Sequence, residues 1–193
     1  MINFHKAALS LSAKKALRCG ILLKTAALTT LITACARIPE MPQGELTKPM
    51  TLASAFEGRV VGKGVFRVPI TGYERPFRAV LNGTLKGTML TVVEDFEYDD
   101  GEKDRLTWKF TRTSPNTWTG VREDTVGVAQ VVEDGQNVRL EYTADIRSNG
   151  STTRLSFADV LYLRTDGTII NKAIARRFGV PIGTIHLEMR PEK

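Results

Sequence analysis

From Phe56 to the end of the chain, apolar and polar residues alternate with a period of two almost everywhere. The cleanest example is VRLEYTADI at residues 138–146, where every even position is apolar. This period is typical of a β-strand with one buried face and one solvated face. Asn-Gly or Asp-Gly pairs separate successive segments at residues 82, 100, 134, 149 and 166, and such pairs favour tight hairpin turns. The pattern therefore predicts an all-β protein.

About eight to ten short-connected strands are compatible with an antiparallel sandwich or a closed barrel. We favour a single up-and-down barrel over residues 55–193, because hairpin-length connections place consecutive strands side by side. Gly62 and Gly64 share the apolar face of one predicted strand, which suits a strongly bent barrel wall. Barrels of this size can enclose one small apolar ligand.

The first 34 residues differ in composition from the rest. They hold five of the 27 basic residues and none of the 21 acidic ones, so the remaining chain is nearly neutral. The net charge of +6 is therefore no argument for a nucleic-acid partner, and we expect none. A basic start followed by the apolar stretch 25–34 has the form of a secretory signal peptide, and this stretch is too short to span a bilayer as a mature helix.

The apolar stretch ends in Leu-Ile-Thr-Ala-Cys at residues 31–35, which resembles the lipobox of bacterial lipoproteins. The resemblance implies that residues 1–34 are removed and that Cys35 carries acyl chains, several of which anchor a protein stably to a membrane. Alanine at position 36, rather than aspartate, resembles lipoproteins sorted to the outer membrane. We therefore expect a lipid-anchored protein on the periplasmic face of the outer membrane. Residues 35–54 contain three prolines and no period, and they predict a tether.

Cysteine and histidine counts exclude several kinds of site. After removal of residues 1–34, the chain holds Cys35 and His186 as its single cysteine and histidine. A disulfide, a cysteine-bound zinc and a site with several histidines are therefore excluded. The acidic stretch 95–106 resembles a calcium loop, but its glycine is one place late and its twelfth position is Leu106. We predict no cofactor, no metal and no recognisable catalytic set.

Four charged residues fall on the apolar faces of predicted strands: Glu94, Asp159, Lys172 and Arg176. Isolated buried charges cost several kcal/mol, so we expect these side chains to pair with one another, with tyrosines or with a ligand. Three explanations stay open. The charges form a structural ion-pair network or are turned outward by a β-bulge, they orient a ligand, or they take part in catalysis.

The leading hypothesis is a binding module that holds a fatty acyl group or another apolar molecule inside the barrel. The four charged residues would fix the polar end of the ligand, as the few polar groups of an apolar pocket usually do. The predicted cavity lining consists of the aromatic residues Phe66, Phe96, Trp108, Tyr142 and Phe157. One alternative is a lipid isomerase or hydratase with Glu94 or Asp159 as its acid or base. Another is a structural envelope lipoprotein whose barrel is filled by its own side chains.

Three blocks resemble a known family in the same order: EDFEYDDGEKDRLTW at 94–108, ADVLYLRTDGTIINKA at 158–173 and RRFGVPIGTIHLEMR at 176–190. This is a family of uncharacterised proteobacterial lipoproteins, domain of unknown function 3833, and the resemblance covers about residues 56–190. It implies a lipocalin-like barrel facing the periplasm, with no established activity. Family members are often encoded near lipid-modifying genes, which favours lipid chemistry. The family often has a second acid beside the position of Asp159, where this chain has Ala158.

Overall fold

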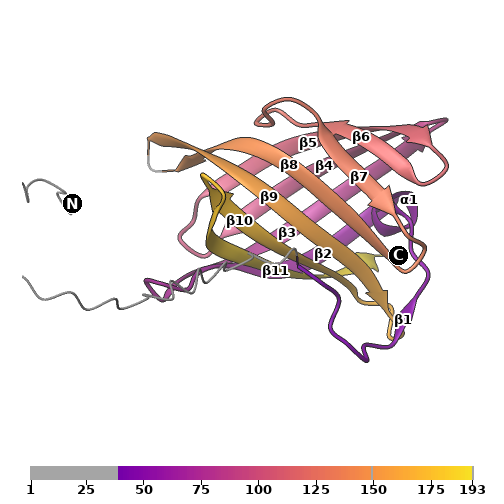
Figure 1. Ribbon diagram of the computed structural model, residues 1–193, viewed down its shortest axis with the longest axis horizontal. Helices are drawn as coiled ribbons and strands as arrows, with labels where there is room; N and C mark the ends of the chain where they lie inside the picture. Colours follow the sequence, from indigo (N-terminus) through magenta and orange to yellow (C-terminus); the bar gives the residue numbers. More distant parts are fainter. Residues whose placement is uncertain (1–38, 149, 193) are drawn as a thin grey trace, which may run out of the picture. The chain divides into compact units, whose positions relative to one another are not determined.

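The computed structural model describes residues 39–148 and 150–192 (Figure 1). The predicted signal peptide, residues 1–34, and the predicted lipidation site Cys35 lie outside these residues. The described residues form a single compact unit. In the described part of the chain, no helix is long and apolar enough to cross a membrane.

Ten antiparallel strands, β2 to β11, form the wall of a barrel (Figure 1). Each strand pairs with the next along the chain, and β11 pairs with β2, which closes the barrel. The predicted all-β, up-and-down barrel is thus confirmed. The wall strands are β2 Gly58–Val68, β3 Tyr73–Lys86, β4 Met89–Tyr98, β5 Lys103–Ser114, β6 Thr117–Val121, β7 Ala129–Glu133, β8 Asn137–Ser148, β9 Ser151–Arg164, β10 Ile169–Arg177 and β11 Val180–Glu192.

The strand register turns the apolar alternation inward. In β8 and β9, Leu140 lies opposite Asp159 and Tyr142 lies opposite Phe157, and all four side chains share the inner face. In β2, Gly64 lies opposite Phe77, and a Cβ atom on Gly64 would come within 2.4 Å of the Phe77 ring. Glycine at this position therefore leaves room for the Phe77 ring on the inner face of the wall.

A short helix, α1 Leu52–Phe56, covers one end of the barrel, on the right in Figure 1. Thr51 caps the helix, since its side chain accepts a hydrogen bond from the Ser54 N–H. Inside, Glu133 Oε1 accepts hydrogen bonds from the Leu52 N–H and from Trp118 Nε1, both at 2.8 Å. Residues from α1 and from the surrounding strands fill this end with a tightly packed apolar core.

The residues before α1 differ from the predicted tether. Strand β1, Thr47–Lys48, pairs with the end of β9, just beyond the point where β8 begins. Met50 is buried, and its N–H donates to the Gly135 carbonyl oxygen at 3.2 Å. The predicted domain boundary at residue 55 is therefore too late. The physical reason is that a two-residue strand and a five-residue helix are too short to show a hydrophobic period.

Candidate functional site

The end of the barrel opposite α1 is hollow. A cavity of about 870 Å³ extends inward from this end, and Phe56 of α1 and Phe110 of β5 are among the residues that line it. A barrel filled throughout by its own side chains therefore does not describe this interior.

The five aromatic residues predicted to line the interior all do so: Phe66, Phe96, Trp108, Tyr142 and Phe157. Tyr142 stacks on Phe157 with ring centres 4.8 Å apart, and Trp108 meets Tyr142 edge-on at 5.2 Å. Such aromatic pairs stabilise the wall beyond their buried area. The cavity thus has a largely apolar, aromatic lining that suits an apolar ligand.

The wall of the cavity is not a hydrogen-bonded ladder all the way round. Strand β6 pairs with the second half of β5, and β7 pairs with the first half of β8, so the open-end halves of β5 and β8 are not bridged by these strands. Segment 122–128, between β6 and β7, covers this gap. Glu123 accepts a hydrogen bond from the Thr107 N–H at 2.7 Å, and the Asp124 carbonyl oxygen accepts one from the Asp145 N–H at 2.9 Å.

Arg122 begins this segment and points into the barrel, where its side chain is 8% exposed. Its Nη1 donates to Glu94 at 3.1 Å, and its Nε and Nη2 donate to the two carboxyl oxygens of Asp124 at 2.7 and 2.9 Å. The guanidinium also lies 4.8 Å from the ring centre of Trp108 and 5.4 Å from that of Tyr142. Sequence reasoning missed Arg122. The available signal was its position two residues after Gly120, which continues the inward face of β6.

Burial and neighbouring charges have opposite effects on the pKa values of Glu94 and Arg122. Burial raises the pKa of Glu94, although the positive charge and hydrogen bond of Arg122 act to lower it. Burial alone would lower the pKa of Arg122, but Tyr142, Glu94 and Asp124 outweigh it and raise this pKa. Arg122 is therefore a permanent cation. Its carboxylate partners balance its charge.

Asp159 lies in a different environment on the same cavity wall. Its Oδ2 accepts a hydrogen bond from Asn171 Nδ2 at 3.1 Å, whereas Oδ1 of Asp159 and Oδ1 of Asn171 are buried without a partner among the described residues. Burial raises the pKa of Asp159 to about 7, against the smaller opposing effects of Asn171 and Arg122. Burial, followed by the charge of Asp159, also holds the pKa of Tyr142 well above its ordinary value. With Glu94 paired to Arg122, Asp159 is the better placed acid or base for the enzyme alternative.

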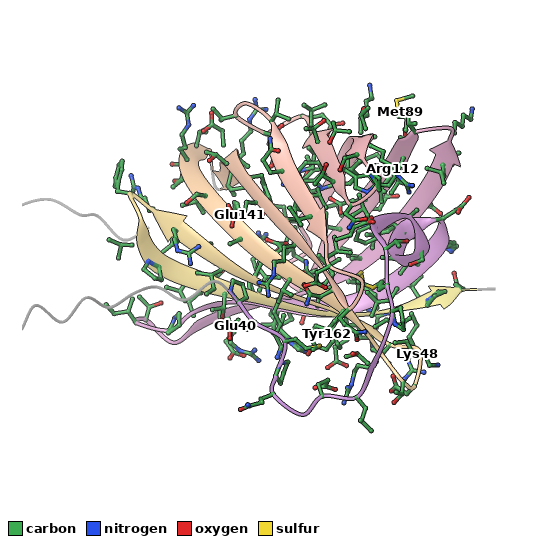
Figure 2. All side chains as sticks on the ribbon, turned by 45° about the vertical axis from the view of Figure 1, so that its right-hand side comes forward. Glu40, Lys48, Met89, Arg112, Glu141 and Tyr162 are labelled. Atoms are coloured by element: carbon green, nitrogen blue, oxygen red, sulfur yellow. The ribbon has the colours of Figure 1, made fainter. Side chains whose placement is uncertain are left out.

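Lys172 and Arg176 do not enter the cavity, and their predicted inward orientation is wrong. Lys172 lies opposite Val160 on the outer face, and its Nζ is 5.8 Å from the ring centre of Tyr162. Tyr162 is labelled in Figure 2. Arg176 lies opposite Ser156, on the same outer side. The inner face of β10 instead carries Asn171 and two alanines. Both faces of β10 contain buried apolar residues, with Ile169 inside and Ile170 outside, so hydrophobicity alone does not assign its faces.

At the rim of the cavity, Arg75 stacks on Tyr98, with its guanidinium carbon 3.7 Å from the ring centre. It donates to Asp100 at 2.8 Å and also contacts Glu102, so two acids of the β4–β5 turn pair with this guanidinium at the rim. Within residues 39–148 and 150–192, no three His, Cys, Asp or Glu side chains come together as a metal site requires.

The model of a protein family described as protein of unknown function, DUF3833, matches residues 29–191. The chain belongs to this family. No curated protein shows significant sequence similarity to this DUF3833 chain.

Two solved structures share the fold. The S-type phycobiliprotein lyase CPES from Guillardia theta is 8% identical, with a TM-score of 0.52 over 71% of this chain and 88% of that one. Rv2717c from M. tuberculosis is 13% identical, with a TM-score of 0.52 over 72% of this chain and 94% of that one. The DUF3833 chain thus has a lipocalin-like barrel fold, and at these identities the likeness concerns the fold alone.

Proposed function

We propose that this DUF3833 protein is a lipid-anchored binding protein that holds an apolar ligand, such as a lipid, inside its barrel at the periplasmic face of the outer membrane. The observation that carries the binding function is the cavity of about 870 Å³. Aliphatic and aromatic side chains make up the larger part of its lining, together with buried polar groups and with charged side chains at the rim. Pockets of this size and lining are typical of small-molecule sites.

The half-filled barrel also supports a container function. A protein that needed only a stable barrel would gain free energy by filling its interior, because unfilled apolar space loses packing contacts. Here the half next to α1 is packed, while large aromatic side chains at the other end leave space open. The fold is therefore stabilised at one end and kept hollow at the other.

Ligand binding is tested by filling the cavity. Ile185 of β11 lines the cavity opposite Phe66, whereas its neighbour Thr184 is exposed. We expect Ile185→Trp to weaken binding of an apolar fluorescent probe, N-phenyl-1-naphthylamine, about tenfold or more, since the indole occupies ligand space. Thr184→Trp is the matched control and should bind the probe as the parent does.

Titration of residues 36–193 measures both affinities, and native mass spectrometry of the same protein from its host looks for a lipid that co-purifies. Equal probe affinity in parent and Ile185→Trp, with no co-purified lipid, would contradict the binding function.

The anchor is supported by the lipobox-like sequence before Cys35. We expect Cys35→Ser to move the protein from the membrane fraction to the soluble periplasmic fraction, because the acyl chains have no other attachment point. Fractionation with immunoblotting measures this, and mass spectrometry of the amino-terminal peptide identifies the acyl chains in the parent. An amino-terminal peptide of the parent that carries no acyl chain would contradict the anchor.

A further inference from the structure

We propose, building on the binding function above, that the cavity takes a lipid whose polar group donates a hydrogen bond and carries no negative charge, such as an alcohol or an amine, and that it discriminates against a free fatty-acid carboxylate. Two independent features of the interior lead to this: the way in which its cations are already paired, and the acceptor atoms that are left without a donor.

The interior offers no unbalanced positive charge to a carboxylate. Arg122, the buried arginine of the cavity wall, already holds both Glu94 and Asp124. A third carboxylate, that of the ligand, would give up its hydration and face the two negative charges already gathered on the same guanidinium. Lys172 and Arg176, which a fatty-acid headgroup would need, lie on the outer face of β10.

The cations at the rim do not change this balance. Arg75 is bound by Asp100 and Glu102, and Arg105 donates to Asp95 at 2.6 Å with its side chain 70% exposed. Arg147 also reaches the cavity edge, and it is exposed. Charges in contact with water are screened, so they act weakly on a polar group inside the barrel.

The interior does offer hydrogen-bond acceptors. Oδ1 of Asp159 and Oδ1 of Asn171 are both buried without a donor in the described part of the chain, and both residues line the cavity. The two side chains come from adjacent strands and are joined by the hydrogen bond between Asn171 Nδ2 and Asp159 Oδ2. A buried acceptor that lacks a donor is unfavourable, so binding becomes more favourable when a ligand hydroxyl or ammonium group donates a hydrogen bond to it. A carboxylate ion has no proton to donate and gains nothing there.

The test compares three ligands with the same dodecyl chain: dodecan-1-ol, dodecylamine and dodecanoate. Each is titrated at pH 8 against N-phenyl-1-naphthylamine bound to residues 36–193. We expect the alcohol and the amine to displace the probe at concentrations about tenfold or more below that of dodecanoate. Dodecanoate that displaces the probe as well as the alcohol does would overturn this inference while leaving the binding function intact. Failure of the probe and of all three ligands to bind would remove both.

Substitutions test which side chains cause the preference for the alcohol over dodecanoate. Asp159→Leu removes the acceptor, and we expect the advantage of the alcohol over dodecanoate to shrink to about threefold or less, because no buried acceptor then rewards the hydroxyl. Asn171→Leu removes the second acceptor and serves where Asp159→Leu does not fold. Asp145→Asn, at the exposed rim where Asp145 pairs with Arg154 at 2.8 Å, is the matched control and should keep the full preference. An unchanged preference in Asp159→Leu and Asn171→Leu would show that these acceptors are not its source.

Discussion

Replacing Arg122 with methionine is expected to lower the free energy of unfolding by about 3–5 kcal/mol. Methionine keeps much of the length and apolar contact of the side chain but removes its charge and its three hydrogen bonds. Glu94 and Asp124 would then lie inside the barrel wall without a cation. Uncompensated buried carboxylates are what makes the loss of one partner of a buried ion pair so costly.

Urea denaturation of residues 36–193, followed by the fluorescence of Trp108 and Trp118, measures this change. The matched control is Arg105→Met, which breaks the exposed ion pair with Asp95 and should leave the midpoint almost unchanged. The double variant Arg122→Met with Glu94→Gln should recover part of the loss, since it removes one of the stranded charges. A midpoint for Arg122→Met equal to that of the control would show that the cluster does not hold the wall together.

The second large effect concerns pH. Burial raises the pKa of Asp159 to about 7 in the folded protein, compared with about 4 for an exposed aspartate. Between these two values the folded protein binds a proton that the unfolded chain has released. The stability contributed by Asp159 is therefore full below about pH 4, falls as the pH rises to 7, and is level above that. Raising the pKa of Asp159 from about 4 to about 7 corresponds to a change of about 4 kcal/mol in the free energy of unfolding.

Asp159→Asn removes this titration, because an amide does not ionise. We expect the variant to lack the decline between pH 4 and 7 and to be the more stable protein at pH 8. The groups that face Asp159 are Asn171, Arg122, Glu94 and Tyr142, and all of them stay in place in the variant. Denaturation midpoints of parent and variant at each pH give the difference directly, and Asp145→Asn, at the rim, should follow the parent. Parallel curves for the parent and Asp159→Asn would contradict the assigned pKa.

Much of the barrel could be predicted because apolar and polar residues alternate regularly over long segments. Residues 138–146 alternate without a break, and a strand of that length has one register that buries every apolar side chain. The same logic correctly placed Glu94, Asp159 and five aromatic residues inside. It gave the wrong face for Lys172 and Arg176, because isoleucines occupy both sides of β10 and alternation no longer distinguishes them.

The rest of the site depends on contacts that have no period. Segment 122–128 reaches its place through hydrogen bonds to single backbone groups of β5 and β8, such as Glu123 to the Thr107 N–H. Such contacts join residues far apart in sequence and leave no repeating pattern, so Arg122 was not anticipated as the partner of Glu94. The packing of Met50 and α1, which precede the first wall strand, against the barrel was missed for the same reason. A single helical turn is too short to show a hydrophobic stripe.

The gap in the wall between β5 and β8 has a consequence for how this barrel can diversify. Inside a strand, adding or deleting one residue reverses every side chain beyond it, so the laddered part of the wall tolerates substitution but not a change of length. Segment 122–128 is free of that restriction, because it joins its neighbours at a few points and not along a continuous register. Related chains can thus exchange this short patch, and with it the side chain that stands where Arg122 does, while all ten strands keep their pairing. The buried cation of the interior is thus set by a part of the sequence that does not determine how the strands pair.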